Sequence, residues 1–135
     1  MTESYAEFQI EIWGNTLLIK VIGPTGIAEL EWLRNEIEGK YLSLLSDHWA
    51  ILGDARQWEL YTPEAKEMIA DFTLWAEAEG MQFNLILAPE NSLKLAAAQE
   101  LNMGEVIEHH YVSSMDEAIK WLTLKGVWGD QKIIK

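Results

Sequence analysis

A run of residues with chemically capable side chains extends from Asp54 to Thr62. Asp54 and Arg56 lie two positions apart, so they either form an ion pair or face different ways at the end of a strand. Trp58 and Tyr61 belong to residue types that dominate protein interfaces when exposed, although burial beneath a following helix is the alternative. The Thr62 hydroxyl suits a helix cap or a phosphorylation site. This segment is our first candidate for a binding surface.

Three further polar residues precede expected helices, namely Asn91, Ser92 and Ser114. In open α/β sheets, ligands bind outside the carboxyl ends of the strands, where helix N-termini favour anions. These residues are therefore candidate contacts for an anion or another ligand. The alternative is that they only cap their helices, each contributing about 1 kcal/mol.

Patterns for catalysis and metal binding are weak. Glu108, His109 and His110 are consecutive, but adjacent histidines on a strand point to opposite faces, so we predict no metal site. The absence of cysteine excludes a thiolate zinc site and a cysteine nucleophile. Neither a G-x-S-x-G motif nor a phosphate-binding glycine motif is present. We expect no cofactor and no enzymatic activity; an enzyme acting through the Asp54 carboxylate is the remaining catalytic alternative.

The charge of the chain is strongly negative. Its 135 residues include 22 acidic and 10 basic ones, which gives a net charge of −12. Residues 1–119 carry a net −15 and residues 120–135 a net +3. Because nucleic acids and anionic membranes attract clustered cations, we expect neither as a partner. The sequence shows no secretory signal pattern and no apolar run near the ~20 residues of a membrane helix, so we expect a cytoplasmic protein without a transmembrane segment.

Hydrophobic periodicity predicts one α/β domain. Alternating or continuous apolar runs indicate strands, and apolar spacings of three and four residues indicate helices. We expect strands over residues 8–13, 16–22, 49–53, 83–88 and 106–112, and helices over 27–45, 63–80, 92–102 and from 115 onward. The order implies a mixed sheet of about five strands, with an N-terminal antiparallel hairpin, the remainder parallel, and four helices. The domain covers residues 1–125, and residues 126–135 form a C-terminal tail.

This order of elements resembles the STAS domain of bacterial anti-sigma-factor antagonists, and more closely its divergent STAS-like relatives. The resemblance covers about residues 7–125 and rests on the element order and on Gly53–Arg56 and Thr62–Ala65. STAS domains carry a phosphorylated Ser or Thr at the start of the helix after the central strand. The family pattern in this region is Asp-hydrophobic-Ser, followed a few residues later by Asp-Ser-Ser-Gly. Here Arg56 replaces the Ser that would follow Asp54 and Ala55, so only Thr62 corresponds to the phosphorylated residue.

The resemblance implies a bacterial, non-catalytic regulatory module that binds another protein. We expect it to present the loop after the central strand and the following helix to a protein partner or to a second copy of the chain. The residues expected to make contact are Asp54, Arg56, Trp58, Tyr61 and Thr62. Some STAS-like proteins are thought to bind lipids, so a small apolar ligand or lipid in a pocket between sheet and helices is the alternative.

Overall fold

An antiparallel hairpin forms one side of the sheet. The computed structural model describes residues 7–100 and 108–133, and in it β1 (Glu7–Trp13) pairs with β2 (Thr16–Thr25) from Glu7↔Ile22 to Trp13↔Thr16. The turn uses Gly14 at φ 65°, a left-handed conformation that favours glycine. β2 runs three residues further than the sequence predicted, through Gly23 and Pro24, with a register irregularity between Gly23 and Thr25.

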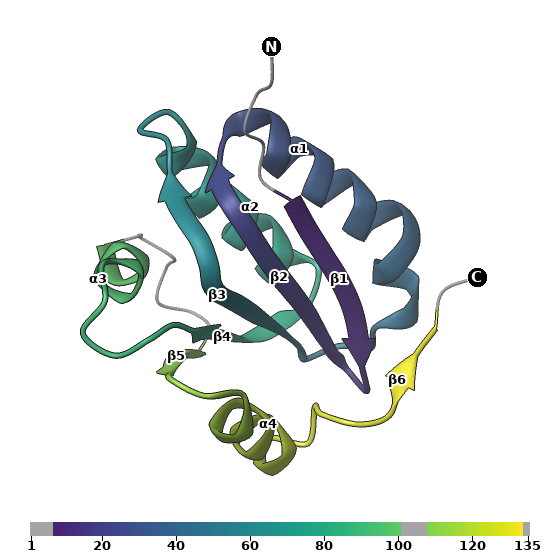
Figure 1. Cartoon of the computed structure of the whole chain (residues 1–135). Helices are drawn as coiled ribbons and strands as arrows, with labels where there is room; N and C mark the ends of the chain where they lie inside the picture. Colours follow the sequence, from purple (N-terminus) through teal and green to yellow (C-terminus); the bar gives the residue numbers. More distant parts are fainter. Residues whose placement is uncertain (1–6, 101–107, 134–135) are drawn as a thin grey trace.

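The other strands extend this hairpin into a six-stranded mixed sheet of order β5-β4-β3-β2-β1-β6 (Figure 1). β2, β3, β4 and β5 run parallel to one another, whereas β1 is antiparallel to both β2 and β6. The remaining strands are β3 (Trp49–Tyr61), β4 (Met81–Leu87), β5 (Glu108–Val112) and β6 (Gln131–Lys132). The predicted mixed sheet with four helices is confirmed, with one strand more than expected.

Helices cover both faces of this sheet. α1 and α2 lie together on one side, and α4 lies on the other, over β4 and β5 (Figure 1). The long helix predicted for residues 27–45 divides into α1, a π-helical turn that contains Gly39, and a 3₁₀ turn. The helical segments are α1 (Ile27–Glu36), η1 (Ile37–Tyr41), η2 (Leu42–Leu44), α2 (Ala65–Ala78), α3 (Leu93–Glu100) and α4 (Met115–Leu124).

Each face of the sheet has its own apolar core because side chains alternate between faces along a strand. On the face covered by α1 and α2, Ile19 and Ile51 pack with Leu33 of α1 and Ala76 of α2. On the opposite face, the core residues of the sheet and α4 are Ala50, Leu52, Phe83, Leu85, Leu87, Val112, Ala118 and Leu122. The central strand is thus buried on both sides, as its continuous apolar sequence predicted.

The C-terminal segment adds the unexpected strand. β6 pairs with the end of β1 through Ile12↔Lys132 and Trp13↔Gln131. Just before it, Trp128 stacks on Trp13, with ring centroids 5.2 Å apart and planes 4° apart. The Thr16 hydroxyl donates to the Val127 carbonyl oxygen at 2.7 Å. Residues 127–132 therefore pack against the hairpin, within the segment that we expected to be a C-terminal tail.

Candidate interaction surface and apolar cavity

The segment expected to be a loop after the central strand is the second half of β3. We predicted that the strand ends at Gly53, but β3 continues to Tyr61 and stays paired with β2 as far as Thr25↔Tyr61. We predicted the end at Gly53 because Gly-Asp followed by polar residues is typical of a turn. The prediction was wrong because pairing with β2 keeps these residues extended. Pairing with β4 ends at Asp54↔Leu87, so within the described residues only β2 pairs with the second half of β3.

A bulge sets the direction of the side chains in this half. Lys20 lies opposite Asp54, and Ile22 lies opposite Gln57, so two steps along β2 match three along β3. Such an extra residue bends a strand and redirects its side chains. The bulge lies between Asp54 and Gln57 and contains Arg56, whose side chain folds back onto Asp54.

Asp54 and Arg56 form a two-pronged ion pair. Arg56 Nε lies 2.9 Å from Asp54 Oδ1, and Arg56 Nη2 lies 2.8 Å from Asp54 Oδ2. The Arg56 backbone N–H also donates to Asp54 Oδ1 at 3.1 Å. The Asp54 side chain is only 4% exposed, whereas that of Arg56 is 48% exposed. Of the two arrangements that the sequence left open, the structure has the ion pair.

Burial alone would raise the pKa of the Asp54 carboxyl. The hydrogen bonds from the Arg56 side chain and backbone, together with the charges of Arg56 and Lys20, outweigh this effect and lower the pKa below its ordinary value of 3.8. The hydrogen bonds that the Arg56 side chain donates to Asp54 in turn raise the pKa of Arg56; burial opposes this effect, and the Asp54 charge adds to it. At neutral pH, Asp54 is therefore an ionised and fully engaged carboxylate.

Two lysines join this ion pair from neighbouring elements. Lys94 of α3 donates from Nζ to the Arg56 carbonyl oxygen. Lys20 of β2 lies opposite Asp54 in the sheet, close enough for its charge to act on that carboxyl. We call Lys20, Arg56 and Lys94 the basic patch; it holds three of the ten basic residues of a chain with net charge −12.

The aromatic residues of the segment are buried or half-buried rather than exposed. Trp58 is only 6% exposed, and its indole N–H donates to Thr25 Oγ1 at 3.0 Å. It stacks on the half-buried Tyr61, with ring centroids 6.0 Å apart, and shares a core cluster with Ala98 of α3. Of the two alternatives for Trp58, the structure has burial, so contact with a partner there requires Tyr61 or the polar neighbours.

Thr62 lies just after β3, and its side chain does not cap α2. That helix begins at Ala65, its N-cap is Glu64, and no side chain makes the capping hydrogen bond. Thr62 instead extends the strand, since its N–H donates to the Thr25 carbonyl oxygen at 3.0 Å, and its own carbonyl accepts from Ala65. The predicted cap was wrong because Thr62 is held in the β2–β3 pairing rather than in the first helical turn.

The other candidate hydroxyls do cap their helices. Ser92 Oγ accepts from the Leu95 N–H at 3.1 Å, and Ser114 Oγ accepts from the Glu117 N–H at 3.1 Å. Asn91 precedes the first of these caps with φ 54°. Capping thus accounts for Ser92 and Ser114, and ligand contact by any of the three stays a prediction.

The two adjacent histidines lie apart, as expected for a strand. His109 Nδ1 is 3.3 Å from the Asn84 side-chain amide, whereas His110 stacks on Trp121 of α4 with ring centroids 5.2 Å apart. In residues 7–100 and 108–133, no three His, Cys, Asp or Glu side chains gather as metal ligands. Within the same residues, no helix is long and apolar enough to cross a membrane.

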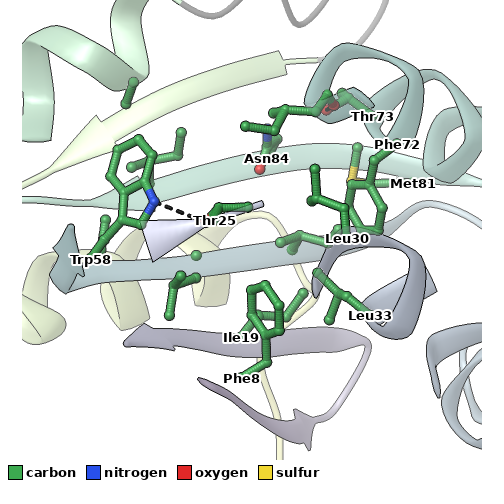
Figure 2. A pocket seen from close by; sticks show the side chains of 17 residues that line it. Phe8, Ile19, Thr25, Leu30, Leu33, Trp58, Phe72, Thr73, Met81 and Asn84 are labelled. Carbon is green, nitrogen blue, oxygen red and sulfur yellow. Dashed lines mark hydrogen bonds between the residues drawn. The ribbon is translucent and has the colours of Figure 1, made fainter. Parts of the chain in front are cut away.

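An apolar cavity of about 140 Å³ lies on the other side of β3 (Figure 2). Gly53, Ala55 and Trp58 of β3 line it, together with side chains of β1, β2, β4, α1, α2 and α3. A pocket between sheet and helices was the alternative that the sequence left open, and of the candidate contact residues named there only Trp58 lines this cavity. Its one usable signal was Gly53, which interrupts an otherwise bulky apolar strand.

A larger groove of about 470 Å³ lies between α1 and α2. Charged side chains line much of it, three of them acidic and one basic. The residues of the groove are Leu30, Glu31, Arg34, Asn35, Glu38, Met68, Asp71 and Phe72. With Arg34 already placed over the Trp75 ring at 4.9 Å, the groove offers mainly carboxylates.

Comparison with known proteins places the fold. No known family profile and no curated protein matches the sequence. A solved structure of the unphosphorylated anti-sigma-factor antagonist SpoIIAA matches with a TM-score of 0.61 and 15% identity, covering 87% of this chain and 98% of that one. An uncharacterised Shewanella loihica protein with a SpoIIAA-like fold matches with a TM-score of 0.68 and 17% identity, covering 90% and 97%. The chain has a STAS-like fold.

The phosphorylated form of Bacillus SpoIIAA also matches, with a TM-score of 0.55 and 15% identity over 86% of this chain and 99% of that one. These matches confirm the STAS-like resemblance predicted from the sequence. At such low identity they establish the architecture alone, so function has to be argued from this chain's own residues.

Proposed function

We propose that this chain is a non-catalytic, cytoplasmic regulatory module of bacteria that binds an acidic surface of a protein partner through its basic patch. The likeness to SpoIIAA, which is named as an anti-sigma-factor antagonist, supports a regulatory role. The observation that carries the proposal is the gathering of Lys20, Arg56 and Lys94 around the middle of β3 in a chain of net charge −12.

The Arg56 guanidinium suits this role because it is held in place before a partner arrives. Two hydrogen bonds to the buried Asp54 carboxylate fix its plane, while about half of the side chain stays exposed. A guanidinium has five N–H donors, so the remaining ones are available to a partner carboxylate or phosphate. Fixing the side chain in advance lowers the entropy lost on binding.

Charge also favours the basic patch as the contact for an acidic partner. Like charges facing each other across an interface cost several kcal/mol, so the acidic remainder of the chain repels such a partner. The basic patch is the place where attraction replaces repulsion, and it directs the orientation of the encounter. Binding should accordingly weaken as salt concentration rises.

Thr62 is the candidate for regulation by phosphorylation within this proposal. It directly follows β3 and is partly exposed. A phosphate adds a charge of about −1.5 to −2. Placed at the end of β3, that charge opposes an acidic partner, so Thr62→Glu should weaken binding in the same direction as loss of a cation from the basic patch.

The structure argues against the catalytic alternative for Asp54. A general acid or base needs a pKa near the working pH and a free position for substrate. Asp54 has a lowered pKa and accepts three hydrogen bonds from Arg56. The Asp54 carboxylate therefore holds the Arg56 side chain in position.

The test compares two lysines that change the net charge equally. Tagged wild-type protein, Lys94→Glu and Lys66→Glu are used for affinity capture from the source cells; Lys66 is exposed on α2, away from the basic patch. A partner captured by wild type should bind Lys94→Glu about tenfold more weakly in calorimetry, while Lys66→Glu stays within about twofold.

Equal loss in both variants would show that only net charge matters and would refute the basic patch as the contact. Recovery of only a second copy of the chain would replace the partner by a homodimer, which sedimentation equilibrium measures directly. Binding that does not change between low and high salt would also contradict the proposal.

A further inference from the structure

The cavity beside β3 has the properties of a ligand site, and it lies apart from the basic patch. Its floor is formed by the β-sheet, and Leu30 and Leu33 of α1 and Phe72 of α2 line it on the helical side (Figure 2). Phe8 and Phe72 are themselves partly exposed, so a molecule reaches the cavity past these rings.

We propose that this cavity binds a small, uncharged, mainly apolar molecule of roughly six to nine non-hydrogen atoms, such as a single aromatic ring. The size follows from the volume of about 140 Å³. An apolar cavity of roughly 150 Å³ is known to bind benzene, whereas drug-sized ligands need roughly 300–1,000 Å³. A whole lipid or fatty acid therefore exceeds the space.

Gly53 is the second observation that points to a ligand. Glycine in the middle of a strand weakens it and often marks a place where a ligand approaches the backbone. The Gly53 backbone does not have the positive φ that requires glycine. A Cβ added there would have the Leu85 carbonyl oxygen, 3.9 Å away, as its neighbour. Since neither conformation nor crowding requires glycine, its effect is to leave space in the cavity wall.

The chemistry of the wall determines the class of ligand. Among the described residues that line the cavity there is no Asp, Glu, Lys or Arg, so a charged ligand would lose its hydration without a counterion from them. The polar side chains that line the cavity are already engaged: Thr25 accepts from Trp58, Thr73 donates to the Ile69 carbonyl oxygen, and Asn84 lies 3.3 Å from His109. The wall therefore favours contact with apolar atoms.

The test uses benzene, benzoate and palmitate as ligands. Benzene should bind wild type with a Kd of about 1 mM or tighter in ligand-observed NMR. Benzoate has the same ring with a charge, and palmitate has a long chain; neither should bind in the cavity. Gly53→Val adds a branched side chain that suits a strand and fills the space, and should raise the benzene Kd at least about tenfold.

Two further variants separate filling of the cavity from disturbance of the fold. Ala98→Leu fills the cavity from α3 and should have the same effect as Gly53→Val. Gly39→Ala is the matched control because Gly39 is exposed and has no atom within 4 Å of an added Cβ. It should leave the Kd unchanged, and circular dichroism should show all variants folded.

Absence of benzene binding to wild type would overturn the proposal. Binding that survives both Gly53→Val and Ala98→Leu would place the ligand elsewhere and refute this cavity as the site. Displacement of benzene by palmitate would identify a lipid site instead. None of these outcomes depends on the basic patch, so this proposal and the proposed function fail independently.

Discussion

The two halves of β3 differ in what surrounds them. In the first half, Trp49–Gly53, the strand lies between β2 and β4 with helices on both faces, and Ala50 and Leu52 are fully buried. In the second half, Asp54–Tyr61, pairing with β4 ends at Asp54, and in the described part of the chain only β2 pairs with the strand beyond that residue. The first half therefore carries the core, and the second half is where the strand meets solvent and α3.

The second half is not simply an exposed end. Asp54 is 3% and Trp58 6% exposed, yet both are polar enough to need partners. Each has one: Asp54 has the Arg56 fork, and the Trp58 indole has the Thr25 hydroxyl. The comparison shows that a strand can leave the apolar core without losing its order when its buried polar groups are hydrogen-bonded.

The strongest test of the contrast is truncation in the first half. Leu52 is fully buried between β2 and β4, so Leu52→Ala removes apolar contacts and leaves a cavity. We expect a loss of about 3 kcal/mol in the free energy of unfolding, measured by urea denaturation. Glu59→Ala, an exposed position in the second half, should change it by less than about 0.5 kcal/mol. Equal losses would contradict the division of β3.

A smaller effect is expected from breaking the ion pair in the second half. Arg56→Ala leaves the Asp54 carboxylate buried without its cation, and we expect a loss of about 1–2 kcal/mol, moderated because the guanidinium is half exposed. Asp54→Asn combined with Arg56→Ala should lose less than Arg56→Ala alone, because the uncompensated charge is gone. A double-mutant cycle on urea denaturation measures this difference, and simple additivity would refute the coupling.

The sequence predicted the first half of β3 and the helices around it for a clear reason. Trp49–Leu52 is a continuous apolar run, and α4 has both its apolar stripe and its cap at Ser114 in the sequence itself. These elements depend on residues that are close in the chain. The STAS-like fold could therefore be predicted from their order.

The second half could not be predicted because its partners are distant in the sequence. The buried Trp58 indole depends on its hydrogen bond to Thr25 of β2. The polar residues after Gly53 stay extended because they pair with the same strand. The strand β6 likewise depends on the contact between Trp128 and Trp13. Local patterns contain none of this information, so the polar residues were interpreted as a turn and the last residues as a tail.

The smallest expected effect concerns stability in acid, and it isolates the contribution of Asp54 to the second half of β3. Because the folded pKa of Asp54 is lowered, its stabilising contribution is complete above the ordinary pKa of 3.8 and is lost as pH falls through the lower folded value. Asp54→Asn has no such titration. Between pH 7 and pH 5, the difference in unfolding free energy between wild type and Asp54→Asn should stay constant.

Below about pH 4 that difference should shrink progressively as Asp54 becomes protonated in wild type. Urea denaturation of both proteins across this range measures it. The many other carboxylates titrate in both proteins and cancel in the comparison. A difference that stays constant down to pH 2.5 would mean that the exposed half of Arg56 is too well solvated to hold the proton off Asp54, and the ion pair would then position Arg56 without stabilising β3.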